Sequence, residues 1–187
     1  MKVFNKCPEF NKYKVGERIS EGADGETFIS EDKVIKFVIV TDTKKNVNNV
    51  WFKNKNIINY IQDSNQSHLC KVFDFGLVKV IEQPYSVIYF YLMEKLNKLS
   101  EDESKAIDSL ISHRDYNKQP NINKSLGLIK DLSKFLDFDY NKISNFLINI
   151  RDSNLVHLDM HPRNVMKDSF GNFNLIDFDR MEKNHGK

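Results

Sequence analysis

Three polar side chains near the end of this 187-residue chain have types and spacing suited to proton transfer and metal binding. Asn164 follows Asp159 by five residues, and Asp177 follows Asp159 by eighteen. A carboxylate such as that of Asp159 can accept the proton of an attacking hydroxyl. Asn164 and Asp177 present oxygen atoms, which hard divalent cations prefer, and such cations usually lie between a carboxylate and phosphates. The pattern predicts a metal-assisted site with Asp159 as its base.

The residues around these three side chains carry a resemblance to a known superfamily. Residues 157–164 read HLDMHPRN, and residues 175–179 read LIDFD. The two segments resemble the catalytic loop H-x-D-x-x-x-x-N and the metal-binding motif D-F-x of the protein-kinase-like superfamily. The resemblance extends over residues 13–180. It implies ATP as the phosphoryl donor and Mg²⁺ as the metal, with Asn164 and Asp177 as its ligands.

The resemblance also implies roles for the neighbouring residues. His157 is expected to be structural, packing the loop against the strand before Asp177, whereas Asp159 is the catalytic base or orienting group. His161 stands where protein kinases commonly carry a lysine, and we expect it to donate to the γ-phosphate as a further catalytic residue. Leu158 replaces the usual arginine, so no arginine is available there to bind an activation-loop phosphate.

A glycine-containing segment lies near the start of the chain. Residues 13–19 and 27–30 are predicted to form two strands of a hairpin. Between them, Ser20, Gly22 and Gly25 occupy the three glycine positions of the kinase motif G-x-G-x-x-G, with serine in the first. Glycine allows backbone N–H groups to approach phosphate oxygens that a Cβ atom would obstruct. These three residues are therefore expected to bind the phosphates of ATP.

The next two elements supply a cation and its supporting helix. Residues 33–40 read as an apolar strand that contains Lys36, which resembles the V-A-I-K lysine that contacts the α- and β-phosphates. Residues 43–63 have the apolar periodicity of an amphipathic helix in the place of the kinase helix αC. The sequence has no glutamate from residue 36 to residue 79, so Asn54 is the nearest counterpart of the usual ion-pair partner.

A second hairpin is predicted to lead into the hinge of the resembled fold. Residues 73–81 and 86–93 read as two buried strands. Met93 would take the gatekeeper position at the end of the second strand. The backbone of Glu94 and of Leu96 would contact the edge of the adenine.

Helices are expected to fill the rest of the chain. Ser100 and Glu103 form a capping box at the start of the first helix. A loop is expected over 116–123, followed by helices over 124–137 and 140–153, the last of which delivers the chain to the catalytic loop.

The predicted fold class is therefore α+β, a bilobal protein-kinase-like fold with an antiparallel five-stranded N-lobe plus αC and a truncated helical C-lobe. The expected domains are an N-lobe over 1–93, a hinge over 94–97 and an abbreviated C-lobe over 98–187. Only eight residues follow Asp179, where a typical protein kinase continues through an activation segment and further helices. The expectation is a minimal kinase without control by activation-loop phosphorylation.

Composition limits the function classes. The net charge of +2 is too small to indicate binding to nucleic acid or to an anionic membrane. Cys7 and Cys70 belong to no metal-like cluster, so both are expected to be reduced thiols. The N-terminus lacks the apolar region of a secretory signal, and the longest apolar run, 87–93, is too short to cross a bilayer. A cytoplasmic monomer is expected.

Three functions remain open for the chain. The leading hypothesis is a serine/threonine protein kinase that uses ATP and Mg²⁺, acts on a protein substrate, and is either constitutively active or activated by a partner protein. The first alternative is a small-molecule or sugar phosphotransferase of the aminoglycoside-kinase type, which His161, Pro162 and the segment 176–179 favour. The second alternative is a nucleotide-binding pseudokinase that acts through a partner, which the missing glutamate and Ser20 favour.

Overall fold

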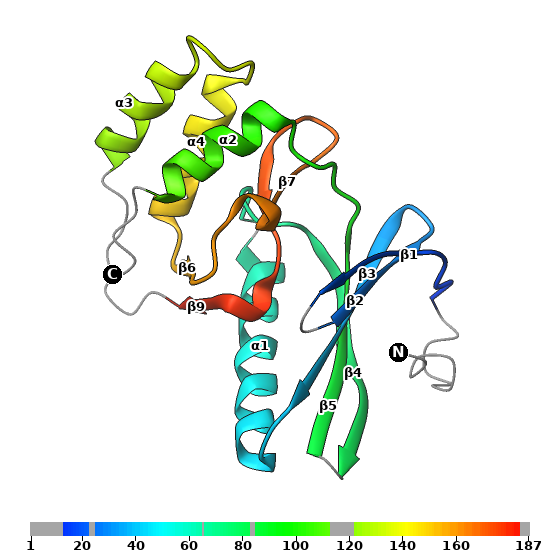
Figure 1. Ribbon diagram of the computed structural model, residues 1–187. Helices are drawn as coiled ribbons and strands as arrows, with labels where there is room; N and C mark the ends of the chain where they lie inside the picture. Colours follow the sequence, from blue (N-terminus) through cyan, green and yellow to red (C-terminus); the bar gives the residue numbers. More distant parts are fainter. Residues whose placement is uncertain (1–12, 23–24, 65, 83–84, 113–121, 184–187) are drawn as a thin grey trace. The chain divides into compact units, whose positions relative to one another are not determined.

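The computed structural model describes residues 13–22, 25–64, 66–82, 85–112 and 122–183. These residues form an α+β structure with a five-stranded antiparallel sheet, a helix inserted between its third and fourth strands, and further helices and short strands (Figure 1). The chain divides into two compact units, residues 1–63 with 71–95, and residues 64–70 with 96–187. No helix of the described part is long and apolar enough to cross a membrane.

The first unit contains the sheet, whose strand order is β1-β2-β3-β5-β4. Its strands are β1 (Arg18–Gly22), β2 (Gly25–Ser30), β3 (Lys33–Thr41), β4 (Val72–Glu82) and β5 (Tyr85–Glu94). The predicted strands over 33–40, 73–81 and 86–93 are confirmed by β3, β4 and β5. β5 is buried along nearly its whole length because both of its faces are covered.

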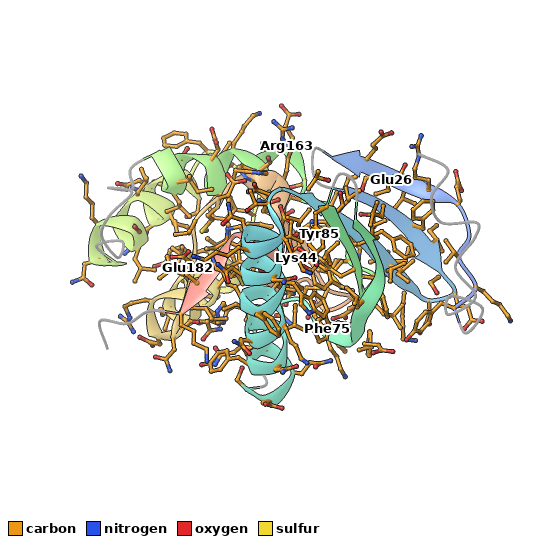
Figure 2. All side chains as sticks on the ribbon, turned by 90° about the horizontal axis from the view of Figure 1, so that it is seen from below. Glu26, Lys44, Phe75, Tyr85, Arg163 and Glu182 are labelled. Atoms are coloured by element: carbon orange, nitrogen blue, oxygen red, sulfur yellow. The ribbon has the colours of Figure 1, made fainter. Side chains whose placement is uncertain are left out.

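Helix α1 (Lys44–Ser64) covers one face of this sheet, as the periodicity over 43–63 predicted. Side chains alternate between the faces of a strand, so Tyr89 and Tyr91 of β5 share one face and Phe90 lies on the other. The Trp51 ring of α1 lies 5.5 Å from the Tyr89 ring and 5.4 Å from the Phe75 ring, which Figure 2 shows on β4 beside the helix. Apolar side chains of β3, β4 and β5 form a core on the opposite face: Ile35, Phe37, Val78, Ile88, Phe90 and Leu92.

The first strand differs from the prediction. β1 begins at Arg18 and continues to Gly22, whereas the sequence placed the strand over 13–19 and a loop after it. The reason is that Gly22 pairs directly with Gly25, so the strands continue up to a short turn. That turn, residues 23–24, lies outside the described residues, as do residues 83–84 between β4 and β5.

The described residues of the second unit form three α-helices and two small two-stranded sheets. Its helices are α2 (Glu101–Ser112), α3 (Ile122–Leu132) and α4 (Tyr140–Asp152). Its short elements are β6 (Leu155–His157), the 3₁₀ turn η3 (Pro162–Asn164), β7 (Val165–Lys167), β8 (Phe173–Leu175), the 3₁₀ turn η4 (Phe178–Arg180) and β9 (Met181–Lys183). β6 pairs with β9, and β7 pairs with β8.

The helices of this unit confirm the local signals in part. The capping box is present, since the Glu103 N–H donates to Ser100 Oγ at 3.2 Å and the Ser100 N–H donates to Glu103 Oε2 at 2.7 Å. α4 begins at Tyr140, where Asp139 accepts the Lys142 N–H at 3.1 Å, and it packs on β8 through Phe146. α3 ends at Leu132, before the predicted residue 137, because i to i+3 hydrogen bonds tighten the chain there. The loop expected over 116–123 lies mostly outside the described residues, and α3 already begins at Ile122.

Candidate functional site

The loop that carries Asp159 and Asn164 is held by its own hydrogen bonds. The Asn164 side chain donates from Nδ2 to the Asp159 carbonyl at 2.8 Å, and its backbone N–H donates to the His161 carbonyl at 2.8 Å. Asn164 is buried, whereas the Asp159 side chain is 55% exposed. Because the nitrogen of the Asn164 amide is used by the loop, its oxygen is the end that a cation would use.

His157 connects this loop to the segment before Asp177, as the sequence predicted for a structural histidine. Its Nδ1 accepts the Asp159 N–H at 3.2 Å, so the proton of the neutral ring lies on Nε2, which donates to the Ile176 carbonyl at 2.9 Å. Burial lowers the pKa of His157, and this outweighs the Ile176 carbonyl and the nearby carboxylates of Asp177 and Asp159, which raise it. The folded protein therefore holds a neutral His157.

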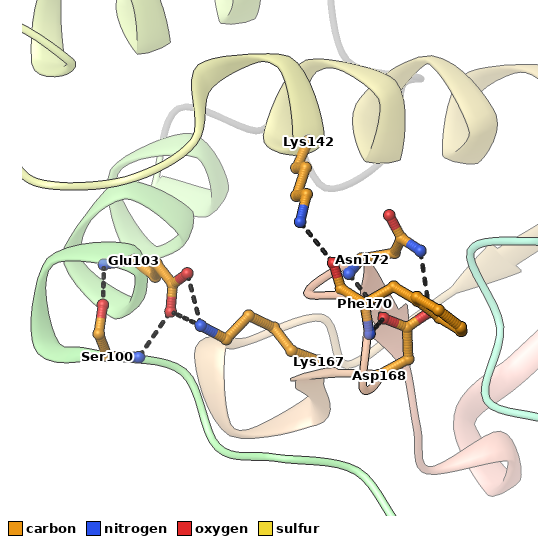
Figure 3. Close-up of polar contacts among 7 residues, drawn as sticks. All are labelled: Ser100, Glu103, Lys142, Lys167, Asp168, Phe170 and Asn172. Carbon is orange, nitrogen blue, oxygen red and sulfur yellow. Dashed lines mark hydrogen bonds and ion pairs between the residues drawn. The ribbon is translucent and has the colours of Figure 1, made fainter.

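A β-hairpin connects the two residues predicted to bind metal. β7 begins directly after Asn164, β8 ends two residues before Asp177, and the Ile176 N–H donates to the Asn164 carbonyl at 2.9 Å. The turn is closed by Asp168, whose Oδ1 accepts the N–H groups of Phe170 at 2.9 Å and of Asn172 at 2.8 Å (Figure 3). The hairpin thus brings Asn164 and the residue before Asp177 together at its base.

Asp177 has an unusual backbone conformation. Its φ of 67° and ψ of 62° place it in the left-handed region, which Asp and Asn adopt more readily than other non-glycine residues. Phe178, which follows it, is 1% exposed and anchors η4 in the core. The Asp177 side chain makes no capping bond to η4, although it precedes that turn. A backbone held in a sparsely populated region is a common feature of functional sites.

His161 lies beside the predicted base. Its Nδ1 accepts the Arg163 N–H at 3.2 Å, so the ring proton of neutral His161 lies on Nε2, 3.8 Å from Asp159 Oδ2. The His161 side chain is 38% exposed. This arrangement leaves Nε2 as the donor of the neutral ring, and donation to a γ-phosphate stays a prediction.

The oxygen donors of the site could hold a cation only with help from a ligand. In the part of the chain that the structure describes, no three His, Cys, Asp or Glu side chains form a group that could hold a metal ion. Asn164 and Asp177 offer an amide oxygen and a carboxylate. Mg²⁺ sites commonly combine one or two carboxylates with phosphate oxygens and water, and this donor set fits such a site.

The predicted phosphate-binding residues of the first unit lie in adjacent strands rather than in a loop. Ser20 pairs with Thr27, Thr27 pairs with Lys36, and Lys36 pairs with Tyr91. Directly paired residues share a face, so these four side chains form a row across the sheet on the face that α1 covers. In this row, the ammonium-bearing side chain of Lys36 lies between the hydroxyl-bearing side chains of Thr27 and Tyr91.

Gly25 has a packing reason to be glycine. A Cβ atom there would lie 1.9 Å from the Phe37 carbonyl oxygen of β3. Glycine at position 25 is therefore required for β2 and β3 to approach this closely, whether or not the residue also binds phosphate. Gly22, which pairs with Gly25, ends β1 at the turn.

Asn54, which the resemblance made the nearest counterpart of the missing glutamate, lies on the sheet-facing side of α1. It is 1% exposed, and its Nδ2 donates to the Tyr89 hydroxyl at 2.7 Å. This bond ties α1 to β5 without using a charge. The sequence contained no sign of Tyr89 as the partner of Asn54.

The three predicted hinge residues fall on both sides of the division between the units. Met93 is buried at the end of β5, and the Glu94 N–H donates to the Lys71 carbonyl at 3.0 Å. Leu96 belongs to the second unit. The backbone N–H of Glu94 is thus used within the first unit.

The sequence missed one polar contact of the second unit entirely. Lys167 of β7 forms an ion pair with Glu103 of α2, at 2.7 Å. Glu103 was identified only as a capping residue, and no local pattern links it to a residue 64 positions away.

Comparisons with known proteins give no family for the chain: no protein-family model matches it, and no curated protein is significantly similar to it in sequence.

Proposed function

We propose that this chain transfers the γ-phosphate of ATP to serine and threonine hydroxyls of protein substrates, with Mg²⁺. Asp159 accepts the proton of the acceptor hydroxyl as its oxygen attacks the γ-phosphorus. The bond from that phosphorus to the β,γ-bridging oxygen breaks, and ADP leaves. Asn164 and Asp177 hold the metal, which neutralises charge on the phosphates, and Lys36 contacts the α- and β-phosphates.

One observation carries the proposal. The Asn164 side chain donates to the Asp159 carbonyl at 2.8 Å, and the Asn164 backbone carbonyl accepts the N–H of Ile176, the residue before Asp177, at 2.9 Å. The base and both metal ligands therefore belong to one hydrogen-bonded framework. Phosphoryl transfer depends mainly on positioning and charge neutralisation, which a framework of this kind supplies.

The exposure of the base favours a large acceptor. The side chains of Asp159 and His161 are 55% and 38% exposed. A loop on the surface of another protein can reach the Asp159 carboxylate at that exposure. His161 Nε2, which lies 3.8 Å from Asp159 Oδ2, is the ring nitrogen that would donate to a phosphate oxygen.

The test is transfer of labelled phosphate from Mg-ATP by the full chain, with Asp159→Asn as the blank. The acceptors are a mixture of proteins in one arm, and aminoglycosides and sugars in the other. Label on protein with the wild type alone supports the proposal, whereas label confined to small molecules replaces it with the phosphotransferase alternative. Retained ATP binding in a thermal-shift assay without any transfer would refute catalysis and support the pseudokinase alternative.

A further inference from the structure

The ion pair between Glu103 and Lys167 is the starting observation. Lys167 Nζ lies 2.7 Å from both Oε1 and Oε2 of Glu103 (Figure 3). The Glu103 side chain is only 10% exposed, and the Lys167 side chain is 23% exposed. Burial opposes the charge on Glu103, but hydrogen bonds from Lys167 and Ser100 and the Lys167 charge hold the pKa of this carboxyl below its usual value. A partly desolvated pair of this geometry is stronger than an exposed one.

Lys167 is joined to the same segment by its backbone as well. Its N–H donates to the Asn97 carbonyl at 2.8 Å, and its carbonyl accepts the Asn97 N–H at 2.7 Å. Lys167 is the last residue of β7, three residues after Asn164. The start of α2 is therefore fastened to the strand that leaves the predicted metal ligand.

The tip of the hairpin is held by a different helix. Lys142 of α4 donates from Nζ to the Phe170 carbonyl in the turn (Figure 3). Gly171, with a φ of 78°, lies directly against that ammonium group, since a Cβ atom there would be 2.7 Å from Lys142 Nζ. The β7–β8 hairpin is thus held at its turn end by two helices, by α2 at Lys167, which pairs with Phe173, and by α4 at Phe170.

We propose that the Glu103–Lys167 pair is a positioning contact for the metal ligands. By fixing β7 it keeps the base of the hairpin closed, so that Asn164 and Asp177 are presented together. This inference rests on the proposed function for its metal, but closure of the hairpin base can be measured without it.

If Glu103 served only as the capping residue of α2, a different experimental result would be expected. As a capping residue, Glu103 needs only to accept the Ser100 N–H, which it does through Oε2 at 2.7 Å. Lys167→Met removes the ammonium group and leaves that capping bond in place. If capping were the only role, Lys167→Met would have no effect on the residues near Asp177.

The first readout is hydrogen exchange of the Ile176 amide, which donates to the Asn164 carbonyl at the hairpin base. We expect Lys167→Met to accelerate this exchange about tenfold and Lys167→Arg to remain within about twofold of the wild type. The matched control is Lys105→Met, because Lys105 pairs with Glu101 of the same helix at 2.8 Å but is exposed. It should leave Ile176 unchanged.

The second readout is the Mg²⁺ concentration that gives half-maximal ATP turnover. Lys167→Met should raise it about threefold to tenfold, and Lys167→Arg should restore it. Unchanged Ile176 exchange in Lys167→Met overturns the inference, and so does an unchanged Mg²⁺ requirement in an active enzyme. If the wild type shows no turnover, the proposed function fails, and the exchange measurement alone decides whether the pair closes the hairpin base.

Discussion

Replacing His157 with alanine removes a side chain that bridges two segments of the candidate site. His157 is 6% exposed, and its imidazole makes one hydrogen bond at 3.2 Å with the Asp159 N–H and one at 2.9 Å with the Ile176 carbonyl. Each bond contributes about 1 kcal/mol, and the apolar part of the ring adds about 1 kcal/mol more. His157→Ala should therefore lower the free energy of unfolding by roughly 3 kcal/mol.

Two further variants separate the two bonds. An asparagine at 157 can place its oxygen near the position of Nδ1 and keep an acceptor for the Asp159 N–H. A glutamine can reach farther and keep a donor for the Ile176 carbonyl. Because each bond contributes about 1 kcal/mol and each variant keeps one of the two, His157→Asn and His157→Gln should each retain about 1 kcal/mol more stability than His157→Ala.

The pH dependence supplies a second check on the same residue. Burial lowers the pKa of His157 from 6.5, so just below pH 6.5 the unfolded chain binds a proton that the folded chain does not. The stabilisation that comes from the neutral, buried His157 is therefore complete above pH 6.5, and it decreases as the pH falls below this value. His157→Gln should lose this part of the slope.

The assay is urea-induced unfolding of the wild type and the three variants between pH 5 and pH 8, with the ΔG in water taken at equal m-values. A loss below about 1 kcal/mol in His157→Ala would show that the imidazole does not bridge the two segments. The same conclusion would follow if His157→Gln kept the full pH slope of the wild type.

Three other predictions concern separate residues. Gly25→Ala places a Cβ atom 1.9 Å from the Phe37 carbonyl oxygen and should lower the free energy of unfolding by about 3 kcal/mol or more. In the control Gly127→Ala, the new Cβ atom has no atom within 4 Å, so this variant should be neutral or stabilising. Equal urea midpoints for the two variants would contradict this prediction. Burial lowers the pKa of His68 from 6.5 to about 4, so the unfolded chain binds the extra proton between these values, and stability should fall by about 2 kcal/mol from pH 7 to pH 5. His68→Gln should remove that fall, and an unaltered pH profile would count against a neutral buried His68. Asp177→Asn should keep its left-handed backbone and its thermal midpoint while losing at least about a hundredfold in Mg²⁺-dependent turnover, and wild-type turnover would exclude Asp177 as a metal ligand.

The elements were predictable where the local pattern was strong. β3, β4, β5 and α1 follow from apolar runs and helical periodicity, and the start of α2 follows from its capping box. The strand β1 was misplaced because the glycines suggested a loop, whereas their pairing extends the hairpin. β9 was not foreseen, since a strand of three residues contains too little pattern to detect, and its partner β6 is distant in the sequence.

In the candidate site, too, some features were predictable from the sequence and others were not. The spacing of Asp159, Asn164 and Asp177 identified the residues, and the position of His157 before Asp159 predicted a packing histidine. The tautomer of His157 and the proton position of His161 depend on backbone groups that approach only after folding. Neither could be derived from residue order.

The sequence by itself determined which side chains carry oxygen atoms that could bind a cation or accept a proton, and how far apart they lie along the chain. Only the tertiary structure decided that Lys167 and Glu103 pair at 2.7 Å and that Asn54 bonds Tyr89 at 2.7 Å. The physical reason is that local propensity and periodicity act over one or two turns, whereas these bonds join residues 64 and 35 positions apart. Long-range partners are selected by the packing of whole elements, and that packing sets which polar groups meet.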